Sequence, residues 1–334
     1  MKQYVAAEKS YREVLRQFPQ SPFVADAITG IQYCLTAQGK EQQALEVLDE
    51  FIKDNPGTTV AEEIALKKAD WLFSQRNYAD AAKEYRTLAD RYPKSKNAAT
   101  AIFKLATCYR IQDNLMESAL TFERAASMAG RASRLAGDAL LEASDIYTAQ
   151  NNRSKARSLL QKIEQEYKDP VVLTEAAYRQ GLLLLLEGKT PEAKNRFEAL
   201  IARSPNLPVA DKCRVAVAKI YILSGDFSPA QSLVELVATT QTNEIGAEAQ
   251  YLVGETLAGR KDWKNAVPAY LRVKYVFGAY EEWVARAYLA LGAVYEATQE
   301  FRKAKEAYEN VVKLNRDEKI VAEAQRRLKY LEQL

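Results

Sequence analysis

Apolar side chains recur along this chain in a pattern that repeats about every 37 residues. One position in each unit follows a turn and serves as an anchor; the anchors are 4, 41, 78, 115, 153, 190, 227, 263 and 301. A small residue stands three positions after each anchor, and a large apolar residue stands seven positions after it. Apolar residues spaced at i, i+3, i+7 and i+10 form one face of an α-helix. The pattern therefore predicts a helix after every anchor and a repeated architecture.

A second apolar pattern precedes each anchor. Nine residues before it, most units have a small residue: Ala69, Ala106, Ser144, Gly181, Ala218, Gly254 and Gly292, with Gln32 as the exception. Six residues before it, the side chain is always Leu or Tyr. Small residues let two helices approach towards the lower end of the usual separation of about 8 to 10 Å. Each unit is therefore predicted to be an antiparallel pair, with a first helix before the anchor and a second helix after it.

Turn residues separate the predicted helices. Between the two helices of a pair, where a left-handed residue ends the first helix, stand Gly39, Asp113, Asn151, Gly188 and Gly225. Prolines recur 15 residues after several anchors and are expected to end the second helix. Pro268 departs from this spacing, because it lies five residues after its anchor, and predicts a kink or a late helix start.

These patterns predict an all-α protein that forms a single α-solenoid over residues 1–334. The predicted pairs are 20–56, 57–93, 94–130, 131–170, 171–205, 206–242, 243–279 and 280–316, with a lone second helix at 1–19 and a further helix at 317–334. The segment 1–19 lacks a first-helix partner, which favours a fragment of a longer protein. At the other end Lys329 stands in the small-residue column. The last helix is therefore expected to be a solvated cap close to a true C-terminus.

One unit carries a set of residues that identifies a family. Its members are Tyr288, Leu291, Gly292, Tyr295, Ala304 and Tyr308. This set resembles the tetratricopeptide repeat, and the same positions can be followed through nearly the whole chain. The resemblance implies a right-handed superhelix of helix pairs that binds other proteins.

The turns between units are longer than in the usual repeat of about 34 residues. The added residues lie in segments such as Tyr92-Pro93-Lys94-Ser95. Such turns look like those of tetratricopeptide proteins of the bacterial cell envelope, including outer-membrane assembly lipoproteins and the periplasmic coordinator of the Tol-Pal system. The resemblance implies a periplasmic or envelope-associated protein. A cytoplasmic location is the alternative, because the sequence shows no signal peptide or lipoprotein cysteine.

Composition narrows the chemistry. Hydrophobic residues make up 48% and charged residues 27%, as in a soluble folded protein. The net charge of +3 is small and both signs are interspersed, so no nucleic-acid partner is indicated. The longest apolar run, Leu182 to Leu186, is far shorter than the roughly 20 residues that cross a bilayer. We therefore expect no membrane insertion.

The chain contains no histidine, which removes the commonest general base and most zinc and haem ligand sets. Cys34, Cys108 and Cys213 stand in separate units among apolar neighbours and are expected to be buried, inert thiols. No motif for a metal, a cofactor or a phosphate is visible. The sequence therefore predicts a protein that is not an enzyme and needs no cofactor.

The family resemblance implies a concave groove lined by the first helices. On that basis the candidate binding residues are Asp70, Phe73, Arg110, Asp145, Tyr178, Leu182, Leu185, Leu186, Lys212, Lys219, Ile222, Tyr251 and Glu255. The middle of this set is unusually apolar and predicts a docking site for an amphipathic helix or an extended peptide, flanked by Lys212 and Lys219. The alternative is that Leu182, Leu185 and Ile222 simply pack against neighbouring units.

A separate candidate contact is Tyr280, which stands in a turn where other units mostly have polar residues. An aromatic side chain that protrudes there would suit a contact with a partner. The sequence thus predicts a protein-binding scaffold with a protein or peptide partner. Two alternatives stay open: a structural segment that self-associates, and an accessory domain of a larger protein whose catalytic part lies outside this chain.

Overall fold

The computed structural model describes residues 2–332, and every regular element in that range is an α-helix. The first nine helices are α1 Lys2–Gln17, α2 Val24–Thr36, α3 Glu41–Asp54, α4 Thr59–Ser74, α5 Tyr78–Arg91, α6 Ala98–Ile111, α7 Leu115–Ala129, α8 Arg134–Ala149 and α9 Arg153–Glu166. The others are α10 Pro170–Leu186, α11 Thr190–Arg203, α12 Pro208–Ser224, α13 Phe227–Thr240, α14 Glu244–Gly259, α15 Trp263–Val276, α16 Glu281–Ala297, α17 Phe301–Leu314 and α18 Glu318–Leu331. The predicted all-α solenoid of helix pairs is confirmed.

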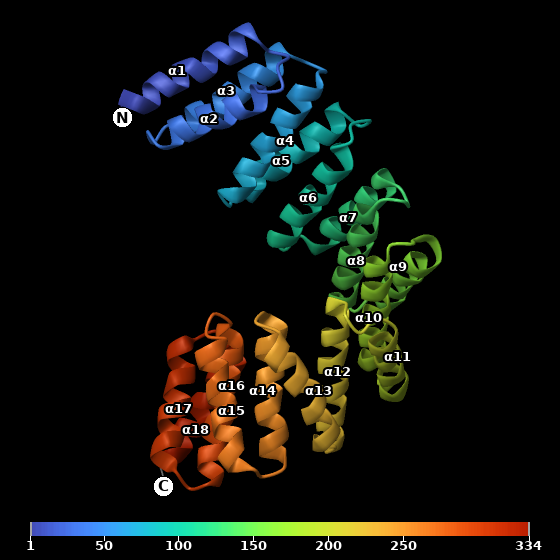
Figure 1. Cartoon of the computed structure of the whole chain (residues 1–334), viewed down its shortest axis with the longest axis vertical. Helices are drawn as coiled ribbons and strands as arrows, with labels where there is room; N and C mark the ends of the chain where they lie inside the picture. Colours follow the sequence, from blue (N-terminus) through green and yellow to red (C-terminus); the bar gives the residue numbers. More distant parts are fainter. Residues whose placement is uncertain (1, 333–334) are drawn as a thin grey trace. The chain divides into compact units, whose positions relative to one another are not determined.

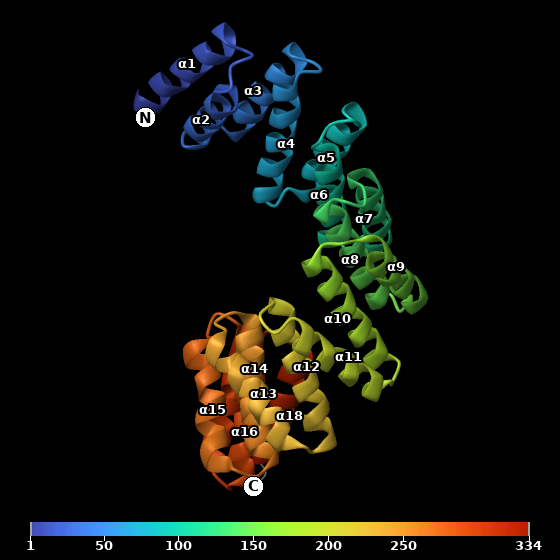
Figure 2. The ribbon, with the colours of Figure 1, turned by 45° about the vertical axis from the view of Figure 1, so that its right-hand side comes forward.

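The chain divides into two compact units, Met1–Ala176 and Ala177–Leu334, which we call the N-terminal and C-terminal units. Within each unit, consecutive helices pack against each other, as with α6 on α7 and α13 on α14. Figures 1 and 2 show α12, α13 and α14 side by side in the C-terminal unit. The predicted single array over 1–334 and its exact repeat boundaries stay predictions, as does the handedness of the superhelix. Residues 1, 333 and 334 of the predicted end segments lie outside the described residues.

Each turn inside a helix pair contains one residue in the left-handed conformation. The residues are Gly39, Arg76, Asp113, Asn151, Gly188, Gly225, Lys261 and Gln299, with φ between 60° and 82°. The N–H of the next residue donates to the carbonyl five residues before it in the first helix, as from Lys189 N to Leu184 O at 2.9 Å. The five turn residues that the sequence predicted are therefore confirmed. Arg76, Lys261 and Gln299 take the same role with long side chains.

Small residues of the first helix lie under aromatic rings of the second helix. Gly254 faces Tyr270 and Gly292 faces Tyr308 so closely that a Cβ atom on either glycine would overlap the ring. The hydroxyls of these tyrosines reach back to the first helix, and Tyr270 Oη donates to Glu255 at 2.5 Å. Burial, together with the neighbouring Glu255, raises the pKa of Tyr270. These two pairs are thus held by a buried ring and a polar contact at its tip.

Two details of the core bear on the sequence predictions. Helix α15 begins at Trp263 with Pro268 inside it, so a late start at Pro268 is wrong. Proline is tolerated here because it removes only one hydrogen bond, close to the start of the helix. All three cysteines are buried, as predicted. Burial raises the pKa of the Cys108 thiol to about 11, which keeps it protonated and unreactive.

Lys68 is a buried cation that the apolar pattern did not predict. It lies in the first helix α4 and pairs with Asp49 at 2.6 Å and with Glu84 at 2.9 Å. Burial alone would lower the pKa of its ammonium, but the hydrogen bonds to the two carboxylates outweigh burial and raise it. The flanking second helices therefore supply the charges that make a lysine acceptable in this core.

Candidate functional site: an apolar groove along α12

The C-terminal unit contains a pocket of about 360 Å³ formed by α10, α12 and α14 with the start of α11. We call it the α12 groove. Its lining residues are Tyr178, Leu182, Leu185, Thr190, Lys212, Val215, Ala216, Lys219, Ile220, Leu223, Ile245 and Glu248. The volume is a little more than twice the roughly 150 Å³ of an engineered apolar cavity that binds benzene. The groove therefore has room for about two large apolar side chains.

Helix α12 forms the floor of the groove along most of its length. Its six lining residues run from Lys212 to Leu223 with helical spacing, so they form one stripe. At 1.5 Å per residue this stripe is about 16 Å long. One end carries the Lys212 ammonium, and the other end carries Leu223, whose side chain is 89% exposed. The floor is therefore cationic at the start of α12 and apolar at its end.

Helix α10 forms an apolar wall. Tyr178, Leu182 and Leu185 are half-buried, because one side of each packs on the core around Phe197 and Val217. The Tyr178 and Phe197 rings lie with centroids 5.6 Å apart. The sequence left open whether these residues fill the groove by their own packing. They contact the core and still leave a pocket beside α12.

Charged groups at the groove come from α12 and α14. Lys219 forms an ion pair with Glu248 across the two helices. The Lys212 ammonium lies 5.8 Å from the centroid of the Tyr178 ring, within the range of a cation–π contact. Two ammonium groups and one carboxylate therefore line the groove.

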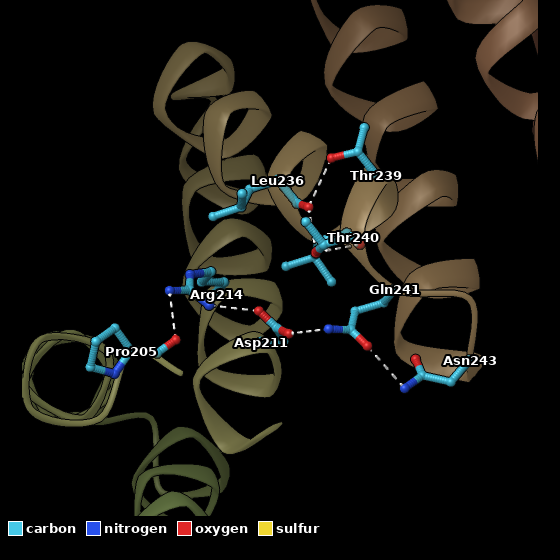
Figure 3. Close-up of polar contacts among 9 residues, drawn as sticks. Pro205, Asp211, Arg214, Leu236, Thr239, Thr240, Gln241 and Asn243 are labelled. Carbon is cyan, nitrogen blue, oxygen red and sulfur yellow. Dashed lines mark hydrogen bonds and ion pairs between the residues drawn. The ribbon is translucent and has the colours of Figure 1, made fainter. Parts of the chain in front are cut away.

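A polar network fixes the beginning of α12 next to the groove (Figure 3). Asp211 accepts hydrogen bonds from Arg214 at 2.6 Å and from Gln241 at 2.8 Å. Arg214 also donates to the carbonyl of Pro205 at 3.2 Å, and Asn243 donates to Gln241 at 3.3 Å. The turns before α12 and after α13 are thus tied to its first turn. The Asp211 carboxylate is neutralised by Arg214 in this network.

The first helices of the N-terminal unit are joined differently. The Lys67 ammonium of α4 donates to the Ala25 carbonyl and to the Thr29 hydroxyl of α2, both at 3.2 Å. Lys104 of α6 pairs with Asp70 of α4 at 2.6 Å. Glu142 of α8 pairs with Arg110 of α6. In each case a long polar side chain bridges to the preceding first helix.

One column of the repeat differs between α12 and the first helices of the N-terminal unit. The bridging residues Lys67, Lys104 and Glu142 all stand 11 positions before their anchors, and Ala216 occupies this position in α12. The alanine side chain is too short to reach α10, so space remains between the helices. The sequence analysis missed Ala216, and with it Val215, Ile220, Ile245 and Glu248. The change from charged residues to alanine in this column was the available signal, and it occurs at Ala290 as well as at Ala216.

Five of the predicted binding residues line the α12 groove: Tyr178, Leu182, Leu185, Lys212 and Lys219. Two others lie next to it, since Leu186 ends α10 with 51% of its side chain exposed and Ile222 packs on the neighbouring core. Tyr251 is half-buried against Tyr270 and Trp283. Asp70 and Glu255 accept hydrogen bonds from Tyr85 and Tyr270 of their own pairs. Both carboxylates thus already have partners within the chain.

The remaining candidates lie elsewhere. Phe73, Arg110 and Asp145 belong to α4, α6 and α8, where Phe73 packs edge-to-face on Tyr78 and Asp145 is exposed. Tyr280 is half-buried at the start of α16, so it protrudes less than the sequence suggested. Tyr275, in the last turn of α15, is far more exposed, at 74%. No group of three or more Cys, Asp or Glu residues within 2–332 could hold a metal ion, and no helix there is long and apolar enough to cross a membrane.

Antiparallel helix pairs that stack on one another and leave a groove along their first helices define an α-solenoid protein with a ligand-sized cleft. The tetratricopeptide repeat family matches residues 66–133, 138–170, 175–206 and 285–318, which together make up half of the chain. The chain belongs to the tetratricopeptide repeat proteins.

Several known proteins are similar to it. The outer membrane protein assembly factor BamD of Xylella fastidiosa is 27% identical over 116 residues, a match that covers 29% of this chain and 40% of that protein. A tetratricopeptide repeat protein from Parabacteroides merdae has a TM-score of 0.58 at 14% identity, over 81% of this chain and 98% of its own. A chain of the APC/C hetero-tetramer Cut9-Hcn1 has a TM-score of 0.56 at 13% identity, over 97% of this chain and 58% of its own. The two structures support the fold alone.

Proposed function

We propose that this chain is a non-catalytic scaffold whose α12 groove takes an apolar segment of a partner protein. The observation that carries the proposal is the pocket beside Ala216, where half-buried leucines and a tyrosine face a stripe of α12. Concave, mostly apolar pockets with a few polar groups are the usual form of ligand sites. Leu223 at the edge of the pocket and Leu186 at the end of α10 are both exposed and add apolar surface, as in grooves that accept one face of a peptide.

We also propose that the partner belongs to an assembly of the bacterial cell envelope. The similarity to an outer membrane protein assembly factor and the long turns between pairs support this location. The chain spans 40% of that relative's length, so neither its partners nor its role carry over directly. Protease treatment of spheroplasts from the native bacterium tests the location. Degradation of the protein in intact spheroplasts is expected, whereas protection until the inner membrane is lysed would indicate the cytoplasm.

Leu185→Asp tests the groove itself. A carboxylate placed on the apolar wall should prevent an apolar segment from binding, because burying an unpaired charge is costly. Proteins that co-purify with the wild-type chain from native cells, quantified by mass spectrometry, should be lost from the variant. Thermal unfolding followed by circular dichroism shows whether the variant stays folded.

The matched control is Thr148→Asp, which places the same charge at the equivalent position of α8 in the N-terminal unit. This variant should retain the co-purifying proteins. If folded Leu185→Asp keeps the same proteins as the wild type, or if both variants lose them equally, the α12 groove is not the binding site.

A further inference from the structure

Helix α1 has an apolar face that the described part of the chain leaves partly open. The face consists of Ala7, Tyr11, Val14 and Phe18, which follow one another at helical spacing, and we call it the α1 face. Figures 1 and 2 show α1 at the edge of the N-terminal unit with α2 beside it. Tyr11 is 37% exposed and Phe18 is 59% exposed. Two aromatic rings of this face are therefore accessible.

Aromatic rings in the same two columns are buried in the other pairs. Seven residues after the anchor, the rings that are at most 1% exposed are those of Tyr85, Phe122, Phe197, Tyr270 and Tyr308. Fourteen residues after the anchor, the rings that are at most 9% exposed are those of Tyr92, Tyr167 and Phe277. Each of these second helices has a first helix packed against it. The α1 face thus has the residues that pack against a first helix.

The α14–α15 pair shows what such a first helix supplies, because α15 has aromatic rings in both columns, as α1 does. Gly254 lies so close to the Tyr270 ring that a Cβ atom would overlap it, and Gly246 borders the Phe277 ring. Glu255, directly after Gly254, accepts a hydrogen bond from Tyr270 Oη at 2.5 Å. The first helix therefore brings two small residues and one carboxylate.

The α4–α5 pair, with Tyr85 and Tyr92 in the two columns, repeats this arrangement. Its first helix has Ala61 and Ala69 at the positions of the two glycines, and Asp70 directly follows. Asp70 accepts from Tyr85 Oη at 2.6 Å. Both first helices thus have a small residue, a second small residue eight positions later, and a carboxylate next to the second one.

The last helix of a second copy does not offer this pattern. In the register of the other first helices, α18 has Val321, Lys329 and Tyr330 at the three positions. A lysine cannot lie where even a Cβ atom would overlap a tyrosine ring. The two helices of this chain that have the pattern, α4 and α14, are already paired. The α1 face therefore fits a helix of a different protein.

We infer that the α1 face binds a helix of a partner protein with a small residue, a second small residue eight positions later, and an Asp or Glu directly after it. The small residues lie against Phe18 and Tyr11, and the carboxylate accepts from the Tyr11 hydroxyl. Gly30 of α2 already packs on the Tyr11 ring, so the ring is in place before the partner binds. This site does not involve the α12 groove, and the inference does not rest on the proposed function.

A synthetic peptide with residues 243–260 of this chain is the probe, because it contains the pattern as Gly246, Gly254 and Glu255 with its own N-cap Asn243. Fluorescence polarisation should show saturable binding to the wild-type chain. The peptide with Gly254→Leu should bind about a hundredfold more weakly. Leucine favours the helix, so this loss would come from the lack of room beside the Tyr11 ring.

Changes in the protein locate the site. Phe18→Ala should weaken binding about tenfold, as for an aromatic anchor. Tyr11→Phe should also weaken it about tenfold, because a hydrogen bond to a charged group is lost. Glu255→Gln in the peptide should weaken binding to the wild type but add no further loss with Tyr11→Phe, since both changes affect one hydrogen bond. The matched control Tyr275→Phe, an exposed tyrosine of α15, should bind like the wild type.

The other outcomes contradict the inference in distinct ways. Without saturable binding, or with equal binding of the Gly254→Leu peptide, the inferred pattern is wrong. If Leu185→Asp abolishes binding and Phe18→Ala does not, the peptide occupies the α12 groove, and the proposed function stands without this inference. A wild-type dimer that Phe18→Ala converts to monomer in light scattering would assign the face to a second copy. If the protein purified alone from the native bacterium does not bind the peptide, another part of its own polypeptide covers the face.

Discussion

The first helices α10 and α12 contact each other differently from those of the N-terminal unit, although all follow the same repeat. In the N-terminal unit the contacts between successive first helices include Lys67, Lys104 and Glu142, which reach back to polar partners. In the C-terminal unit the same column has Ala216, and the space beside it is apolar. At α4, α6 and α8 this column thus supplies a bridge, whereas at α12 it leaves space beside α10. The repeat fixes the scaffold, and side chains that vary within one column change the space between first helices.

The largest effect is expected from filling the groove. Ala216→Leu places a large side chain where the pocket opens, so apolar side chains of a partner lose their place. Affinity for peptides that are selected from a phage-displayed library on the wild-type chain and that fail to bind Leu185→Asp should fall about a hundredfold or more, or about 2.7 kcal/mol, as for a central anchor of an interface. Fluorescence polarisation measures the affinity, and circular dichroism confirms the fold.

Ala216→Ser is the matched control, because it leaves the volume of the pocket open. It should bind within about twofold of the wild type, since a small hydroxyl at the edge of the pocket displaces no ligand atoms. Equal affinity of Ala216→Leu and the wild type would mean that binding takes place outside the pocket.

A smaller difference is expected for the tyrosine contacts within pairs. Tyr270→Phe removes the hydrogen bond to Glu255 and should lower the free energy of unfolding by about 1.5 to 3 kcal/mol, as for bonds to charged groups. Tyr85→Phe should cost less, about 1 kcal/mol, because Asp70 keeps the Lys104 ammonium as a charged partner, whereas Glu255 keeps only the neutral Tyr251 hydroxyl. Urea unfolding of the two variants gives the comparison. A cost for Tyr85→Phe that exceeds the cost for Tyr270→Phe would show that the bridge from Lys104 does not compensate.

The smallest effect is expected from breaking a bridge in the N-terminal unit. Lys104→Ala removes the ion pair with Asp70, in which both side chains are more than one-third exposed. The free energy of unfolding should fall by only about 0.5 kcal/mol, and less at high salt. The variant should gain no affinity for the selected peptides, because polar Asp70 borders the vacated space. Tight binding of these peptides to the N-terminal unit of the variant would mean that alanine at the position of Lys104 is enough to create a peptide-binding site.

Much of the fold could be predicted because helix pairing leaves periodic marks in the sequence. Small residues such as Gly254 and Gly292 recur because an aromatic ring of the second helix lies against the first helix at these positions and leaves no room for a larger side chain. Gly, Asp and Asn residues predicted five of the turns. The turns at Arg76, Lys261 and Gln299 could not be predicted in this way, because residues with long side chains rarely adopt the left-handed conformation. Lys68 escaped prediction because its carboxylate partners come from two different second helices.

The groove could be predicted only in part. Family resemblance indicated the first-helix positions, and five of those residues line the pocket. The resemblance could not distinguish these five residues from Asp70 and Glu255. The tyrosines that donate hydrogen bonds to these two carboxylates lie 15 residues further along the chain. Nor could it find Ala216, because an absent bridge is visible only once the neighbouring helices are in place.

A photo-crosslinking amino acid at two equivalent positions tests the central claim most directly. Leu223 lies at the apolar end of the α12 groove, and Ile111 holds the same place in α6 of the N-terminal unit with 45% of its side chain exposed. After irradiation of living cells, we expect a crosslinked partner protein at 223 and little or none at 111. An adduct at 111 that equals or exceeds the adduct at 223 would contradict the account.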